Sequence, residues 1–110
     1  GTMKQLPYRV QTATGDTLDI EFPFHAETES PVNVNQLLTT ILETINKEVA
    51  LAGPMANGDV LQALAMAIAI RSRMIHAPSE VTSDLARTLT TCALDATTNA
   101  KISRAMHGNA

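Results

Sequence analysis

The first quarter of the chain alternates apolar and polar positions in a way that predicts two β-strands. In residues 17–24, apolar side chains occupy every second position and acidic side chains lie between them. That period is typical of a strand with one buried and one solvated face. A β-branched and aromatic run over residues 8–12 precedes it, and Gly15 lies in the turn signal between the two runs. We therefore predict a hairpin over residues 6–24, with Pro23 at a sheet edge or at the strand's exit.

Three later segments repeat their apolar residues at helical spacing. The first, residues 32–52, carries one apolar stripe and ends at Gly53-Pro54. The second, residues 59–75, is apolar almost all round through its first three turns, so it requires cover on every side. The third, residues 79–106, begins at the capping residue Ser79, and its stripe weakens after Ala96. The pattern predicts an α+β fold, mainly helical, in which a short N-terminal β-hairpin precedes three α-helices.

The same pattern predicts which side chains form the core. We expect the second helix to be its centre, with Leu64 and Ile68 fully buried. Cys92 shares the stripe of Leu85 and Leu89 on the third helix, and we expect it to behave as a small buried hydrophobe. All of the aromatic residues lie in the first quarter of the chain, so the helices must be covered by aliphatic side chains.

The length of the chain suits one domain, residues 1–110, which can bury roughly two-thirds of its unfolded surface without a disulfide or a metal. A lone hairpin leaves open edges, and three helices of this size do not enclose a helix that is apolar all round. Both difficulties disappear if two copies associate. We therefore expect a homo-oligomer, and specifically a dimer, formed through the sheet edge or through close packing of the alanine-rich second helices.

The charge distribution and the length of the apolar runs limit the kinds of partner that the chain can have. The net charge of −3 is uneven, because residues 1–59 hold eight acids and three bases while residues 60–110 hold three acids and five bases. This polarity can steer self-association, but it is too mild to indicate nucleic acid or an anionic membrane. The most apolar run, residues 60–70, is shorter than the roughly 20 residues of a membrane span. We expect neither nucleic acid nor membrane as a partner.

The N-terminus and the single cysteine suggest a compartment. Cys92 excludes an internal disulfide and suits a reducing environment. No apolar signal core follows Met3, and we interpret Gly1 and Thr2 as a cloning remnant. The expected location is the cytoplasm.

Motifs for catalysis, metals or nucleotides do not emerge from the sequence. His25 with Glu27 and Glu29 offers three possible ligands in one acidic loop, but it lacks the spacing of zinc or EF-hand sites. The glycines are too scattered for a phosphate-binding loop, and no histidine lies near Cys92 in sequence. We therefore predict no catalytic residue, no metal site and no cofactor.

Two short stretches resemble the halves of a helix-turn-helix reader of the kind found in sugar-responsive repressors. They are residues 84–89 and residues 101–106. The halves are several residues too far apart, and residues 90–100 contain neither glycine nor proline to form the sharp turn. With the negative net charge, these departures lead us to exclude the motif.

The best-located candidate for a ligand is a small anion near Arg71, Arg73 and His76. Residues two apart on a helix point about 200° apart, so Arg71 and Arg73 cannot both face one pocket on a regular helix. Arg73 and His76 are three apart and share a face, which makes them the better pair. The alternative is that these cations only complement the helix C-terminus.

These patterns do not identify a reaction or a partner. Our leading hypothesis is a small non-enzymatic oligomeric or partner-binding module. The alternative is a small-molecule (anion) binding protein or enzyme with its site at the subunit interface.

Overall fold

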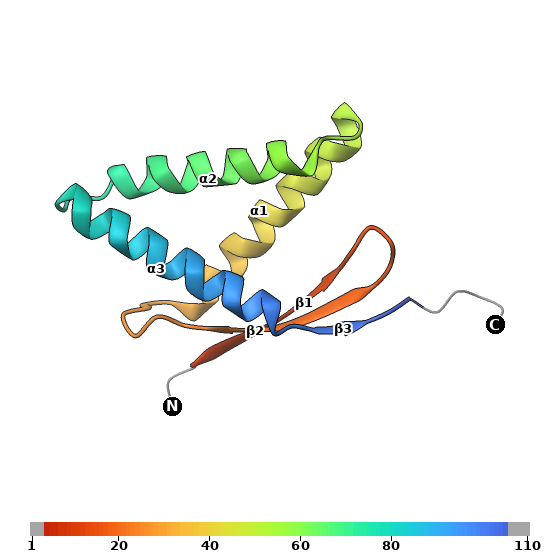
Figure 1. The fold of residues 1–110 in the computed structure, drawn as a ribbon, viewed down its shortest axis with the longest axis horizontal. Coiled ribbons are helices and arrows are strands. Elements are labelled where there is room, and N and C mark those ends of the chain that lie inside the picture. Colours follow the sequence, from red (N-terminus) through yellow and green to blue (C-terminus); the bar gives the residue numbers. More distant parts are fainter. Residues whose placement is uncertain (1–3, 106–110) are drawn as a thin grey trace. The chain divides into compact units, whose positions relative to one another are not determined.

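The computed structural model describes residues 4–105 of the 110-residue chain. The elements follow the order β1 (Gln5–Gln11), β2 (Thr17–Pro23), α1 (Pro31–Ala52), α2 (Asn57–Arg73), α3 (Ser79–Thr98) and β3 (Lys101–Ser103) (Figure 1). The α+β, mainly helical fold with an N-terminal hairpin before three helices is thereby confirmed. Two compact units divide the chain: a sheet unit, residues 1–31 and 89–110, and a helical unit, residues 32–88. The prediction of a single domain stays a prediction.

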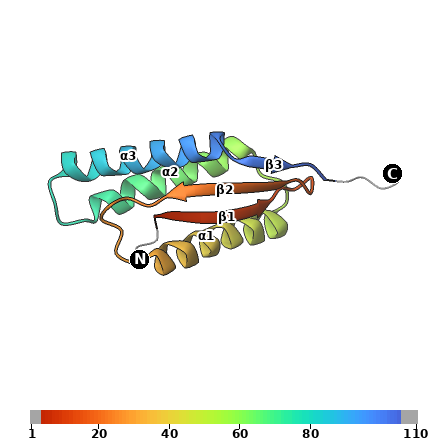
Figure 2. The same ribbon diagram turned by 90° about the horizontal axis from the view of Figure 1, so that it is seen from below.

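In the sheet unit, the strands form an antiparallel sheet in the order β1-β2-β3 (Figure 2). Leu6 pairs with Phe22 and Tyr8 with Ile20, so these apolar side chains share one face, as the alternating sequence predicts. Leu6 and Ile20 are the buried apolar residues of this unit. The opposite face carries the cross-strand ion pair in which Arg9 Nε lies 2.8 Å from Asp19 Oδ1.

The ladder of the hairpin explains why two prolines are tolerated. Phe24 N–H donates to the Lys4 carbonyl at 2.9 Å, and Thr12 N–H donates to the Asp16 carbonyl at 2.8 Å. Because hydrogen-bonded pairs alternate along an antiparallel ladder, the nitrogen of Pro7 points to the open edge of β1. Pro7 therefore costs no ladder bond and blunts that edge against a further strand. Pro23 ends β2, as predicted.

The prediction that the third helix continues to residue 106 is wrong. The helix ends at Thr98, and Lys101–Ser103 forms β3, which pairs with Thr17–Asp19 of β2. Thr97 and Thr98 both donate their hydroxyls to the Leu94 carbonyl, and such local bonds weaken a helix end. Strand pairing then decides the conformation of the next residues. Residues 106–110, including His107, and the interpreted remnant at residues 1–2 lie outside the described residues.

After β3, the chain is hydrogen-bonded to the carboxylate of Asp16 in the hairpin turn. Asp16 accepts the Ala105 N–H at 2.7 Å and a guanidinium hydrogen bond from Arg104 at 3.1 Å. These bonds join residues almost ninety positions apart in sequence, so no local pattern could have predicted them.

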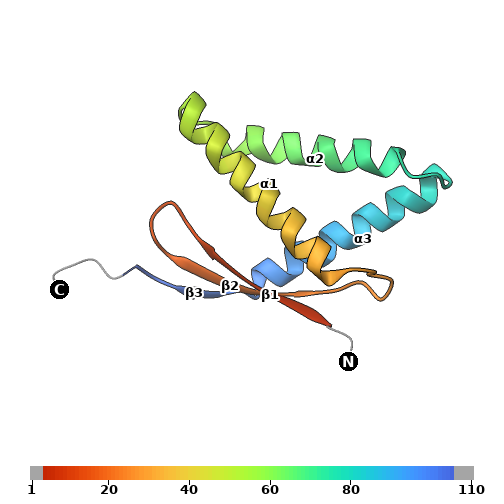
Figure 3. The same cartoon turned by 180° about the vertical axis from the view of Figure 1, so that it is seen from behind.

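In the helical unit, α1 and α2 diverge from the connection between them (Figure 3). Gly53 takes a φ of 88° just after α1, and its N–H donates to the Val49 carbonyl at 3.0 Å. This is the left-handed helix end that glycine favours. α2 begins and ends two residues earlier than the predicted range of 59–75.

The expectation that α2 is the centre of the core, with Leu64 and Ile68 fully buried, is wrong for the single chain. Leu64 is half-buried, and Ile68 is 44% exposed. Within the described residues, α2 has no buried residue, and Thr82 is the buried residue of the helical unit. The reason is that α1 and α3 leave most of the α2 surface uncovered, although its side chains are apolar on nearly every side.

Candidate self-association surface

An open hollow of about 320 Å³ lies among the three helices of the helical unit. Its lining is mostly aliphatic, with Ile41 from α1, Leu64 and Ile68 from α2 and Leu85 from α3. Arg71 supplies the cationic group of this lining. Water that fills such a hollow is held unfavourably, because the apolar walls offer it no hydrogen bonds. Covering the hollow with apolar side chains would therefore lower the free energy.

A second apolar hollow, also of about 320 Å³, lies between α1 and α2 near their connection. Ile45, Met55 and Val60 are among the apolar residues that line it, while Glu48 and Asp59 contribute carboxylates. Apolar recesses therefore occur at two places along α2, rather than in one enclosed pocket of the kind that typically holds a small ligand.

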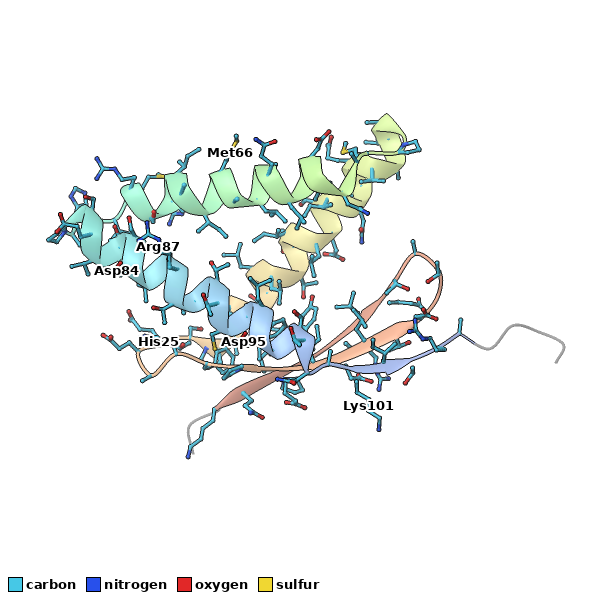
Figure 4. All side chains as sticks on the ribbon, in the orientation of Figure 1. His25, Met66, Asp84, Arg87, Asp95 and Lys101 are labelled. Atoms are coloured by element: carbon cyan, nitrogen blue, oxygen red, sulfur yellow. The ribbon has the colours of Figure 1, made fainter. Side chains whose placement is uncertain are left out.

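The exposed apolar side chains extend beyond these hollows. On α2, Leu61 is 67% exposed, Met66 54% and Ile70 62%. Met66 points away from the other helices of the unit (Figure 4). Met66 and Ile70 are four residues apart and share one face of the helix, and neighbouring exposed apolar side chains of this kind can mark an interaction site.

The three cations of the predicted anion site lie in the last turn of α2 and just beyond it. Arg71 lines the three-helix hollow and donates a hydrogen bond to the Met74 sulfur at 3.6 Å. Arg73 lies about 200° away around the helix, and His76 follows the helix end at Arg73. His76 therefore lies beyond the end of the helix rather than on a helical face with Arg73. The anion site itself stays a prediction.

A more polar hollow of about 470 Å³ lies in the sheet unit. Its lining includes Cys92, Asp95 and Asn99 of α3 with Glu21 and Lys101 of the sheet. Cys92 is half-buried, so the expectation of full burial is only partly met. Among the residues that line this hollow, Lys101 is the one cation, and none is a histidine that could act as a base for the thiol.

The acidic loop after β2 has a local explanation. Glu27 N–H donates to His25 Nδ1 at 3.1 Å, which closes a tight turn and occupies one ring nitrogen. Among residues 4–105, no three histidine, cysteine or carboxylate side chains are grouped so as to hold a metal ion.

The electrostatic perturbations of the molecule lie in the sheet unit. The Ala105 N–H, followed by the Arg104 guanidinium, lowers the pKa of Asp16 below its ordinary value. The hydrogen bond to Asp19 raises the pKa of Arg9. A backbone hydrogen bond and surface ion pairs explain both shifts, and neither points to acid–base catalysis.

Comparison of the chain with protein-family models, with curated proteins and with solved structures finds no match. The second half of the apparent helix-turn-helix begins in β3, which removes the remaining structural basis for that resemblance. Among the described residues, no helix has both the length and the apolar character needed to cross a bilayer.

Proposed function

We propose that the chain is a non-enzymatic module whose function is to associate with a second copy of itself. The observation that carries the proposal is α2, which is apolar on nearly every side and yet has no buried residue in the single chain. A helix of that composition is stable in water only when other surfaces cover it.

The amount of exposed apolar surface supports association. Fourteen large apolar side chains of the helical unit are exposed. Covering the exposed part of one such side chain contributes on the order of 1 kcal/mol. Association costs about 4–15 kcal/mol in lost freedom. Covering most of this set therefore outweighs that cost.

The charge distribution favours a second copy as the partner. The acidic excess lies in residues 1–59 and the basic excess in residues 60–110. Two copies placed so that unlike halves meet gain from complementary potentials, which favours their encounter and orientation. The single cysteine suits a reducing cytoplasm, in which the two copies would associate without a disulfide.

Analytical ultracentrifugation over the micromolar range tests the proposal. The expected species has twice the 11.7 kDa mass of the chain. Ile70→Glu on the exposed surface of α2 should dissociate it, because the substitution places an unpaired charge on apolar surface that the second copy covers. The matched control is Ile102→Glu on β3, a site of similar exposure in the sheet unit, which should leave the dimer intact. A wild-type chain that sediments as a monomer throughout would refute the proposal.

A further inference from the structure

One side of α2 carries a stripe that is acidic at one end, apolar in the middle and basic at the other end. Its members follow one another at spacings of four, three, four and three residues: Asp59, Ala63, Met66, Ile70 and Arg73. Such spacing keeps side chains on one face of a helix. The residues that line the three-helix hollow, such as Leu64 and Ile68, belong to a different face. The acidic end of the stripe, with Asp59, borders the hollow between α1 and α2.

This stripe is self-complementary. Asp59 lies seven residues before Met66, and Arg73 lies seven residues after it. Turning a second helix end for end about Met66 therefore places Asp59 opposite the partner's Arg73, and the same pair repeats at the other end. An isologous contact about a two-fold axis requires this property.

We propose that two copies associate through an antiparallel contact of their α2 helices, with Met66 on the two-fold axis and Asp59 paired with the partner's Arg73 at both ends. The inference rests on the proposed function, since it specifies the surface through which the copies meet. It assigns Arg73 to self-association.

The charged ends are available for such pairs. Within residues 4–105, neither the Asp59 carboxylate nor the Arg73 guanidinium makes a hydrogen bond or ion pair, and both residues are exposed. A parallel contact would set Asp59 beside the partner's Asp59 and Arg73 beside the partner's Arg73. The charges therefore select the antiparallel direction, as charges at the rim of an interface typically do.

The middle of the stripe supplies the apolar contact. Met66 is 54% exposed and Ile70 62% exposed. Ala63 is small, and Ala69 flanks the stripe, so the helix axes can approach closely between the larger side chains. Methionine is flexible and adapts its shape to a copy of itself at a symmetry axis.

Cysteine cross-linking tests the position of the axis. In a Cys92→Ser background, Met66→Cys should form an intermolecular disulfide at least about tenfold faster than Leu61→Cys, because a residue on the axis meets its own counterpart within bonding distance. Leu61 is the matched control, since it lies on the same helix, is 67% exposed, and points about 140° away from Met66. Cross-linking of Leu61→Cys as fast as that of Met66→Cys overturns the inference.

Charge reversal tests the direction of the helices. At low ionic strength, Asp59→Arg and Arg73→Asp should each weaken dimerisation by at least about threefold, since each places like charges together at both ends. The double variant should restore the wild-type dissociation constant, and circular dichroism should show unchanged helix content for all three. Failure of the double variant to restore association overturns the inference. A wild-type dimer combined with either negative result leaves the proposed function standing, whereas a wild-type monomer rejects both.

Discussion

The sheet unit buries Leu6 and Ile20 to 7% and 5% exposure, whereas the helical unit buries no large apolar side chain among the described residues. In the sheet unit, hydrogen bonds, ion pairs and side-chain contacts join residues far apart in sequence, including the Asp16 bonds to Arg104 and Ala105. In the helical unit, the hydrogen bonds that hold the helices are mostly local.

The difference follows from how the two kinds of element satisfy their backbone groups. A strand finds hydrogen-bond partners only on another strand, so the formation of a sheet brings distant residues together. A helix satisfies its own backbone and can be regular without tertiary packing, but most of its stability comes from covering its apolar face. The helical unit is therefore the part whose stability we expect to depend on a second copy.

The largest effect is expected in the sheet unit. Ile20→Ala should cost about 2–5 kcal/mol of unfolding free energy, because it leaves a cavity among buried side chains. Urea unfolding at several protein concentrations measures this loss, which should not depend on association of the helical unit. Ile102→Ala on β3, where the side chain is 50% exposed, is the control and should cost less than about 1 kcal/mol. Equal losses at the two positions would show that Ile20 is not a core residue.

The corresponding substitution in the helical unit sharpens the comparison. Ile70→Ala should cost about 2 kcal/mol per copy in the dimer, because a second copy covers the part of the side chain that the single chain exposes. The loss should appear as weaker dimerisation in sedimentation equilibrium and as unfolding that depends on protein concentration. A loss below about half a kcal/mol would mean that Ile70 stays exposed in the assembly.

Acidification should loosen the end of the sheet unit before it affects the helices. The pKa of Asp16 is lowered by the hydrogen bonds from Ala105 and Arg104. The stability that this contributes is present above the pKa of the unfolded state, and it is lost as the pH falls through the lower folded-state value. The protection of the Ala105 amide against hydrogen exchange, measured relative to its intrinsic rate at each pH, should therefore fall on acidification.

Two variants of single carboxylates isolate that effect. Asp16→Asn should make exchange at Ala105 fast already at neutral pH and remove its dependence on Asp16 protonation. Asp95→Asn, at an exposed position of α3 in the same unit (Figure 4), should leave it unchanged. Wild-type exchange at Ala105 that does not change on acidification, beyond the intrinsic pH dependence of the chemistry, would contradict the role of Asp16.

Cys92 gives a smaller effect, in reaction rate. Because the thiol is half-buried, it should react with an aromatic disulfide reagent more slowly in the native protein than in urea, but faster than a fully buried thiol. Stopped-flow absorbance measures both rates. Equal native and unfolded rates would show that α3 does not protect the thiol, and would reopen a nucleophilic role.

The smallest effect is expected from anions. The lining of the three-helix hollow includes Arg71 but neither Arg73 nor His76, so phosphate and sulfate should raise the melting temperature no more than chloride of matched ionic strength. Thermal shift measurements on the wild type and Arg73→Ala test this. Stabilisation by one anion that disappears in Arg73→Ala would restore the anion site and the alternative function.

For the candidate surface, the sequence predicted that α2 is apolar on nearly every side, but not which of its sides the other helices cover. The apolar character of α2 indicated self-association, and the structure adds which side of α2 faces the hollow and which side points outward. The Arg73–His76 pair stays a prediction, and the structure ends α2 at Arg73, a boundary that the flanking residues do not signal sharply.

The sequence by itself determined the hairpin, its turn, the three helices and the apolar excess of α2, because strand alternation, helical spacing and turn residues act over a few positions. Only the tertiary structure decided that the chain after Thr98 becomes β3, that Asp16 receives Ala105 and Arg104, and that Leu64 and Ile68 remain uncovered in one copy. Those outcomes depend on partners distant in sequence or absent from the single chain. Local propensity carries no information about a strand partner eighty residues away or about the surface of a second copy.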